Sequence, residues 1–287
     1  MITINSTKLV EVGNQRLAIQ VCLEALGTRV SPVPVIASVL NSTRTASALL
    51  RSGALPCFLD VDPKTLQMDV LVLKELLSEE FKDTTPILVL DDPLGIGHNP
   101  AYFDLGLPTI ALQSLPPTKS LMGRSEASVV VFNVGVGSAL FTDHEDLRNT
   151  LEHICRGELG YYTYLDMPTT ADIEGSTHTL ATSYDNYVKC LHKEDLAGII
   201  IKEDVGLSTD FFIRVRNARK VVAHLHSYGF VGELMEPLYV HEEMASRWQV
   251  PPEYPVADNI SRYIVRLSCD TKEHARVAAA IAEVESG

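Results

Sequence analysis

Two neighbouring carboxylates and one histidine form the most reactive group of side chains in the sequence. Asp91 and Asp92 come directly after an apolar run at residues 86–90, and His98 follows within the same loop. Ligands of α/β proteins bind where such strands end, and two carboxylates with an imidazole could ligate a divalent cation or share a proton. The same residues could equally be solvated loop residues that cap the next element, and we prefer this interpretation. The sequence therefore predicts no metal site and no catalytic group here.

Glycines gather in two loops that could bring backbone amides close to a phosphate. Gly95 and Gly97 lie in one loop, and Gly135-Val136-Gly137-Ser138 forms the other. Such loops bind anions because glycine lets the backbone approach the ligand. Neither loop matches the GxGxxG pattern or a P-loop with its Lys-Ser/Thr. We interpret both as ordinary tight turns.

The histidines and serines form no recognisable catalytic pattern. His224 and His226 are separated by one residue on a predicted helix, so they point in different directions and cannot share a metal on one face. No GxSxG nucleophile elbow is present. The residues alone do not name a reaction.

Composition excludes several classes of protein. The chain has 287 residues and a formal net charge of −13, which argues against a nucleic-acid partner because phosphate contacts need a basic surface. Its five cysteines are scattered without a CxxC pair, as in proteins of a reducing cytoplasm. No signal-peptide pattern opens the sequence and no run of 18 apolar residues occurs in it. We expect a cytoplasmic protein with no membrane partner.

Short apolar runs alternate with helical patterns in the first part of the chain. Asn14 is a candidate N-cap for a helix that closes at Gly27. The predicted strands lie within residues 30–40, 55–59, 86–90, 109–112, 128–133 and 138–142, and further helices at 45–51 and 143–153. Strands that alternate with helices indicate an α/β layer with a mainly parallel sheet.

After Leu165 the sequence becomes polar and rich in turn residues as far as residue 186. We interpret this stretch as a domain boundary or as a loop that crosses between two lobes, with a large domain at 1–165 and a smaller C-terminal α/β domain at 166–287. The smaller domain is predicted to contain a helix at 217–228, a strand at 263–267 and a helix from residue 271.

One segment carries a specific family pattern. ALLRSGALPCFLDVDPKTLQMD, at residues 48–69, resembles the DegT/DnrJ/StrS sugar aminotransferases, which are fold-type I pyridoxal-phosphate proteins. The matching positions are Gly53, Ala54, Pro56, Phe58, Asp60, Asp62, Pro63, Thr65 and Leu66. LAIQVCLEALG, GVGSALFT, EPLYVH and the closing segment from YPVADN are similar to further family stretches in the same order. The resemblance implies a fold-type I architecture over nearly the whole chain.

The residues that hold the cofactor in this family are altered here. By the resemblance, the phosphate-binding Ser-Gly-Thr falls on Asn14-Gln15-Arg16, and the aromatic residue that stacks on the pyridine ring falls near Ser42. The carboxylate that pairs with the ring nitrogen, and makes the ring an electron sink, falls near Leu112 or Gln113.

The lysine that forms the Schiff base is missing from its place. The family carries it in a loop before a Gly-rich turn, whereas this chain passes from Asn133 through Val134 directly to Gly135. Lys119 is the nearest candidate, but it precedes the strand rather than following it. Without this amine the family mechanism cannot proceed, so we predict no catalytic residue and no bound pyridoxal phosphate.

Two hypotheses follow from the resemblance. The first is a degenerate family member, a pseudoenzyme that binds a ligand or pairs with a second copy or an active aminotransferase. The alternative is an enzyme with altered chemistry on a nucleotide-linked sugar, in polysaccharide or secondary-metabolite biosynthesis. In either case the side chains expected to line the vacated cleft are Asn14, Gln15, Arg16, Asn41, Asp91, Asp92, His98, Gln113 and Asn133.

Overall fold

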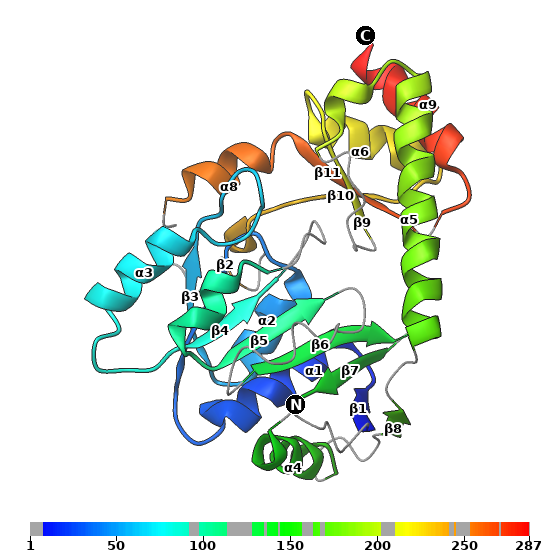
Figure 1. The fold of residues 1–287 in the computed structure, drawn as a ribbon. Coiled ribbons are helices and arrows are strands. Elements are labelled where there is room, and N and C mark those ends of the chain that lie inside the picture. Colours follow the sequence, from blue (N-terminus) through cyan, green and yellow to red (C-terminus); the bar gives the residue numbers. More distant parts are fainter. Residues whose placement is uncertain are drawn as a thin grey trace.

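The larger of two β-sheets organises the first half of the chain (Figure 1). The computed structural model describes residues 8–91, 98–113, 128–134, 137–142, 144–156, 163–166, 170–201, 210–240, 244, 253–269 and 271–286. Eight strands form this sheet in the order β3-β2-β4-β5-β6-β7-β1-β8. They are β1 (Lys8–Val12), β2 (Pro34–Ser38), β3 (Leu55–Leu59), β4 (Ile87–Leu90), β5 (Thr109–Gln113), β6 (Ser128–Val134), β7 (Gly137–Phe141) and β8 (Thr163–Asp166).

The pairing is parallel from β3 through β2, β4 and β5 to β6, and antiparallel from β6 through β7 and β1 to β8. All four residues of β4 are buried, as expected for a strand covered by helices on both faces. The predicted mainly parallel α/β sheet is confirmed.

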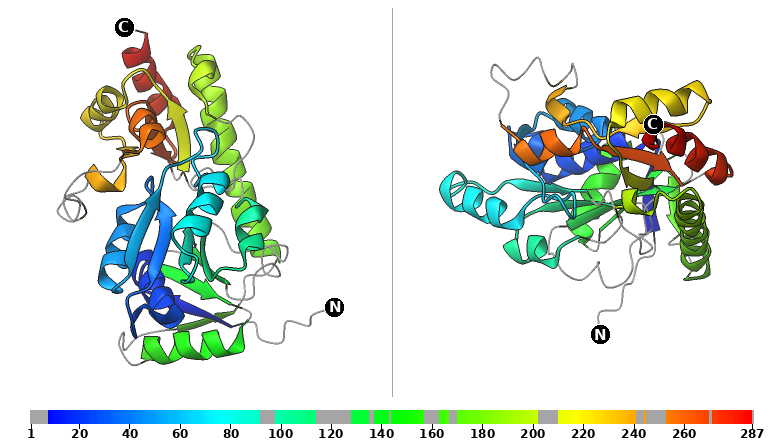
Figure 2. Two further views of the ribbon diagram at one scale, coloured as in Figure 1. Left: turned by 90° about the vertical axis from the view of Figure 1, so that its left-hand side faces the viewer. Right: turned by 90° about the horizontal axis from the view of Figure 1, so that it is seen from above.

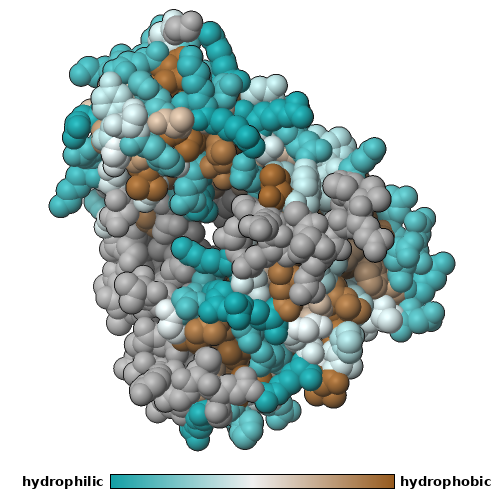
Figure 3. All heavy atoms as spheres, turned by 180° about the vertical axis from the view of Figure 1, so that it is seen from behind, coloured by the Kyte–Doolittle hydropathy of each residue, from teal (hydrophilic) through white to brown (hydrophobic). Residues whose placement is uncertain are grey.

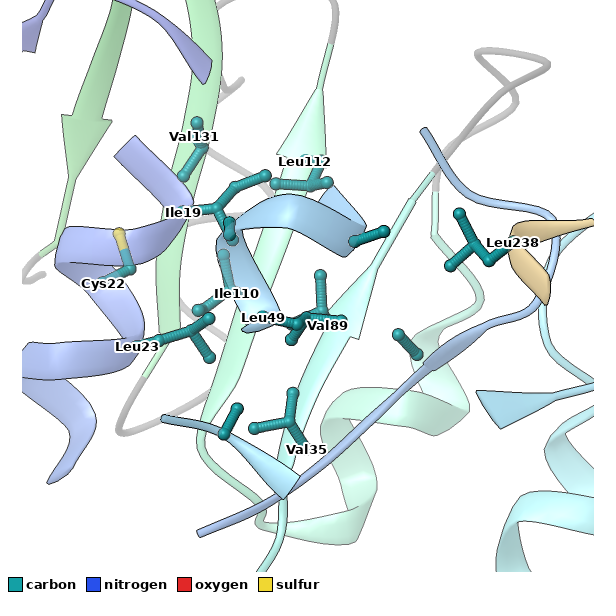
Figure 4. Close-up of a cluster of buried hydrophobic side chains, with 14 of the residues drawn as sticks. Ile19, Cys22, Leu23, Val35, Leu49, Val89, Ile110, Leu112, Val131 and Leu238 are labelled. Atoms are coloured by element: carbon teal, nitrogen blue, oxygen red, sulfur yellow. The ribbon is translucent and has the colours of Figure 1, made fainter. Parts of the chain in front are cut away.

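Alternate residues of the parallel strands enter two different hydrophobic clusters. Val35 and Val89 belong to one cluster, which also contains side chains of the helices α1 (Gln15–Leu23) and α2 (Thr43–Arg51) (Figure 4). Ile36 and Leu88 belong to the other, which contains Leu73 of α3 (Val70–Glu79). Successive strand residues point to opposite faces, so this alternation places α1 and α2 on one face of the sheet and α3 on the other.

Side chains just before these helices fix where they begin. Asn14, the predicted N-cap, accepts a hydrogen bond from the backbone N–H of Leu17 at 3.0 Å. Ser42 caps α2 and Asp69 caps α3 in the same way. Beyond α1 the short helix η1 (Glu24–Thr28) contains Gly27 at φ 115°, which only glycine adopts readily. A helix α4 (Glu145–Ile154) starts two residues later than predicted.

The C-terminal part of the chain forms a smaller sheet. Its order is β10-β11-β9, with all pairs antiparallel. The elements are β9 (Asp210–Arg214), α6 (Ala218–Ser227), β10 (Gly232–Leu234), η5 (Leu238–Val240), α8 (Pro255–Ile260), β11 (Ile264–Ser268) and α9 (His274–Glu285). Short 3-10 helices lie at η2 (Pro100–Leu105) and η4 (Ala197–Ile199).

The predicted turn-rich character of residues 170–186 is wrong, because these residues are helical. Helix α5 spans Thr170–Lys193 and runs from the large sheet to the small one (Figures 1 and 2). Its sequence is polar overall, but Tyr184, Tyr187 and Leu191 lie on one side and are buried in the core of the small sheet. This narrow apolar stripe at helical spacing explains the helix. Among the helices described, none is long and apolar enough to span a bilayer.

Candidate functional site

The strand ends of the large sheet gather most of the predicted cleft residues at one edge. Strand β1 is antiparallel to β7, which is antiparallel to β6, so β1 and the parallel strands end at the same edge. We call this the strand-end edge. The predicted residues that follow or end these strands are Asn14, Gln15 and Arg16 after β1, Asn41 after β2, Asp91 after β4, Gln113 at the end of β5, and Asn133 in β6.

The register brings the ends of the middle strands together. Gln113 pairs with Phe132, and Asn133 pairs with Ser138, which in turn pairs with Val12 of β1. The carboxyl ends of parallel strands are where open α/β sheets bind ligands. The backbone positions of Gln113 and Asn133 therefore lie where a ligand would be expected.

The first turn of α1 presents a positive end at this edge. Asn14 is exposed, whereas Gln15 and Arg16 are half-buried. The Asn14 side chain uses one of the free helix amides, that of Leu17, and the backbone N–H groups of Gln15 and Arg16 precede it. A helix N-terminus attracts anions, and the Arg16 guanidinium adds a full positive charge to the same turn. This turn could hold a phosphate or a carboxylate.

Asn41 and Ser42 form the second part of the strand-end edge. The Asn41 side chain is only 9% exposed. Its Oδ1 accepts the backbone N–H of Ser42 at 2.7 Å, whereas its buried Nδ2 has no hydrogen-bond partner. A buried donor without a partner is rare and costs free energy. The Ser42 hydroxyl accepts the backbone N–H of Thr45 at 3.2 Å and so acts as a helix cap.

The structure describes only part of the predicted group of Asp91, Asp92 and His98. Asp91 is half-buried, and Asp92 lies outside the described residues. His98 is buried and packs edge-on against Phe103 with 6.3 Å between ring centroids. Within the described part of the chain, no three His, Cys, Asp or Glu side chains are placed to hold a metal ion.

Other titratable side chains have structural partners. His224 Nε2 lies 2.9 Å from Glu283 Oε2, and His226 Nε2 lies 2.9 Å from the Gly232 carbonyl, so the two rings have separate partners as expected. The five cysteines are free thiols. Burial raises the pKa of Cys155 to about 11 and that of Cys269 to about 12. Neither thiol is therefore ready to act as a nucleophile near neutral pH.

Sequence reasoning missed a group of charges between the two sheets. Arg44 lies exposed in the first turn of α2, and Asp210 begins β9 of the small sheet. Burial raises the pKa of the Asp210 carboxyl, while the positive charges of Arg266 and Arg44 oppose that rise. Arg266 also contacts Glu233 on β10. In the sequence, Arg44 stands out only because it lies two residues after the helix cap Ser42. This position does not point to Asp210.

A comparison with known protein families tests the predicted resemblance. The DegT/DnrJ/EryC1/StrS aminotransferase family matches residues 4–88. The predicted family resemblance is confirmed. The matched stretch ends within β4, and it includes α1, α2 and the segment at residues 48–69, which we call the signature segment. No curated protein sequence matches the chain.

Solved structures extend the likeness of fold over nearly the whole chain. DesV of S. venezuelae, solved with a ketimine intermediate, is 16% identical with a TM-score of 0.72, covering 98% of this chain and 85% of DesV. DesI, solved with its TDP-sugar product, is 16% identical with a TM-score of 0.74, covering 97% and 80%. NtdA of Bacillus subtilis, solved with bound PMP, is 16% identical with a TM-score of 0.73, covering 98% and 73%. The fold is that of the fold-type I aminotransferases.

Three positions that the resemblance assigns to the cofactor can be located. At the position expected for the stacking aromatic residue, the Ser42 side chain caps helix α2. Leu112 is 2% exposed and packs in the same cluster as Ile19 and Val131 (Figure 4). Val134 of β6 pairs with Gly137 of β7, so residues 135–136 make the whole connection between these strands. Lys119 lies outside the described residues.

Proposed function

We propose that this aminotransferase-like protein does not transaminate with pyridoxal phosphate and instead binds a ligand at the strand-end edge. The observation that carries the proposal is the connection between β6 and β7. Val134 pairs with Gly137, so only two residues separate the paired strands in the sequence, and residues 128–142 contain no lysine. A Schiff base with that amine is the family's route into covalent catalysis.

The other cofactor positions support the same proposal. Pyridoxal phosphate supplies an electron sink, which works when a carboxylate keeps its ring nitrogen protonated. The resemblance assigns this carboxylate to Leu112 or Gln113, and neither side chain is a carboxylate. Leu112 is buried among apolar side chains, and a charged ring nitrogen there would lose its hydration without gaining a partner. Ser42 has no ring to stack on a pyridine. The residues present at the strand-end edge therefore do not fit pyridoxal phosphate.

The test is a pyridoxal-phosphate titration followed by absorbance, then borohydride reduction and intact-mass measurement. We expect no aldimine band and no reduced adduct at stoichiometric cofactor, while an active sugar aminotransferase treated in parallel shows both. A single reduced adduct on the wild-type protein would overturn the proposal. If the adduct disappears in Lys119→Arg, the enzyme interpretation is restored with that lysine as the amine.

A nucleotide-linked sugar is the ligand that the strand-end edge suits best. Its phosphates match the amino end of α1 with Arg16, and the unpartnered Asn41 Nδ2 could donate to a hydroxyl or carbonyl. The likeness to DesI, which was solved with a TDP-sugar, supports this ligand class. An enzyme of altered chemistry would use the same residues, but no described group is placed as an acid, base or nucleophile.

Calorimetric titration with a TDP-sugar tests this assignment. Arg16→Ala should weaken binding by roughly 10- to 150-fold, because a hydrogen bond to a charged group contributes about 1.5–3 kcal/mol. Arg51→Ala is the matched control. Arg51 is exposed in the last turn of α2, whose first turn lies at the strand-end edge, so the same charge is removed from the far end of that helix. Equal affinities of wild type and Arg16→Ala would dismiss the phosphate role.

A partner subunit is the second form of the binding proposal. The chain could pair with a second copy or with an active aminotransferase, as the family resemblance implies. On the face shown in Figure 3, described apolar side chains form separate groups with polar ones between them. Extended interfaces need a larger continuous apolar area, so this face is not assigned to a partner. Sedimentation of the protein alone and mixed with such an aminotransferase would reveal either assembly.

A further inference from the structure

Asp60 of the signature segment makes its most distant contacts with a helix near the other end of the chain. Asp60 Oδ2 accepts the backbone N–H of Val256 at 2.9 Å, and Oδ1 accepts that of Ala257 at 2.9 Å. Oδ1 also accepts the N–H of its neighbour Val61 at 2.9 Å. A carboxylate that accepts three backbone N–H groups is held firmly in one orientation.

These contacts complete the first turn of α8. Pro255 occupies the first helical position and has no N–H, and the preceding residue, Tyr254, forms no side-chain cap. The next two amides, those of Val256 and Ala257, are the ones that Asp60 binds. Asp60 therefore acts as the N-cap of a helix that lies almost two hundred residues away in the sequence.

Helix α8 leads directly into the small sheet. It ends at Ile260, and the following turn joins β11, the central strand of that sheet. The carbonyl of Arg262 accepts the N–H of Ala218 at 3.0 Å, and that of Tyr263 accepts the N–H of Val215 at 2.7 Å. Helix α8, β11 and the start of α6 are thus joined, and the position of α8 sets the position of the small sheet.

A second connection lies beside the first. The N–H of Leu238 donates to the carbonyl of Val39, just beyond β2, at 2.9 Å, and Leu238 is buried in the large core (Figure 4). The two connections are linked because Tyr239 and Tyr254 stack with 5.7 Å between ring centroids. Strands β2 and β3 are neighbours, so both connections anchor the small sheet on the same two strand ends.

We propose that Asp60 is a positioning residue that docks the small sheet onto the end of β3. Figure 1 shows α8 above this strand and to one side of the small sheet. The role explains why Asp60 is kept in a chain whose cofactor positions are changed. Asp62, two residues on, organises its own turn, where its carboxylate accepts the N–H groups of Lys64 and Thr65. The inference stands whether or not the strand-end edge binds a ligand.

Hydrogen exchange of Asp60→Ala tests the proposal. The amides of Val256 and Ala257 should exchange about tenfold faster or more, because two hydrogen bonds to a charged group are lost. Peptides covering 264–268 of β11 should also exchange faster, whereas those covering the distant helix α4 should keep wild-type rates. Asp60→Asn retains one acceptor oxygen and should give an intermediate increase, which keeps the test valid if the alanine variant does not fold.

Asp62→Ala is the matched control, since it removes a carboxylate from the same segment. It should speed exchange at residues 64–67 and leave α8 and β11 as in the wild type. Wild-type exchange at Val256 and Ala257 in both Asp60 variants would overturn the proposal. So would an Asp62→Ala pattern that matches Asp60→Ala, because the effect would then be general loss of stability.

Discussion

A carboxylate at Leu112, one of the two positions to which the resemblance assigns it, should destabilise this protein rather than prepare it for a cofactor. The side chain is 2% exposed and lies in the apolar cluster with Ile19 and Val131 (Figure 4). Leu112→Asp removes a buried aliphatic group and introduces a carboxyl group among carbon atoms. Truncation of a buried leucine costs about 2–5 kcal/mol, and an unpaired buried polar group costs roughly 1–3 kcal/mol more. The expected loss is large beside a typical folding stability of about 5–15 kcal/mol.

The loss should also depend on pH in a defined direction. Burial favours the protonated carboxyl, so its pKa in the folded protein would lie above the unfolded value of about 3.9. The folded variant then binds more protons than the unfolded one, and its stability falls as pH rises through this window. Leu112→Asp should therefore lose more stability at pH 8 than at pH 5, relative to the wild type at each pH. Leu112→Asn, which does not titrate, should show the same deficit at both.

Urea denaturation followed by circular dichroism measures these differences. Leu112→Met is the control for the substitution itself, since a swap of similar volume costs less than about 1.5 kcal/mol. Pyridoxal phosphate should not raise the midpoint of Leu112→Asp. The reasoning is refuted if Leu112→Asp lies within about 1 kcal/mol of the wild type, or if the cofactor stabilises it, because the position would then face a polar site.

Two further changes probe the small sheet. In Gly232→Ala the new Cβ would lie 2.9 Å from Cδ1 of the buried Leu225. We expect the free energy of unfolding, measured by urea denaturation, to fall by about 1–3 kcal/mol. Wild-type stability of the variant would contradict this. Burial lowers the pKa of His274 below its ordinary 6.5, so the folded state favours the neutral ring and stability should fall as pH drops below that value. His274→Gln should abolish this part of the pH dependence, and an unchanged pH profile in the variant would assign it to other groups.

The central strands could be predicted because each is a short apolar run that is buried on both faces. The prediction for Leu55–Leu59 coincides with β3, and β4, β5 and β6 differ from prediction by a residue at an end. Helix α3 was missed although Asp69 caps it and Leu73 is buried at its centre, so a signal was present. Strand β10 has three residues and gave no such pattern.

Pro255 at the first position of α8 is a local start signal, but the cap of this helix could not be predicted from nearby residues, because Asp60, just after β3, supplies it. Contacts of this kind depend on the tertiary structure and have no local sequence pattern. The same limit applies to the candidate site. A strand end identified Asp91 as a candidate, but the charge group of Arg44 and Asp210 arises from two elements that only the fold brings together.

Three matching residues of the signature segment stabilise the fold in ways that do not involve a cofactor. Gly53 adopts φ +76°, and the carbonyl of Thr28 lies 3.5 Å from where a Cβ would be. Asp62 organises its own turn, and Asp60 caps α8. Each of these three matching positions has a structural role that does not involve a cofactor, so the segment would be kept whether or not the protein transaminates. A match to it therefore supports the fold strongly, while activity has to be argued from the strand-end edge.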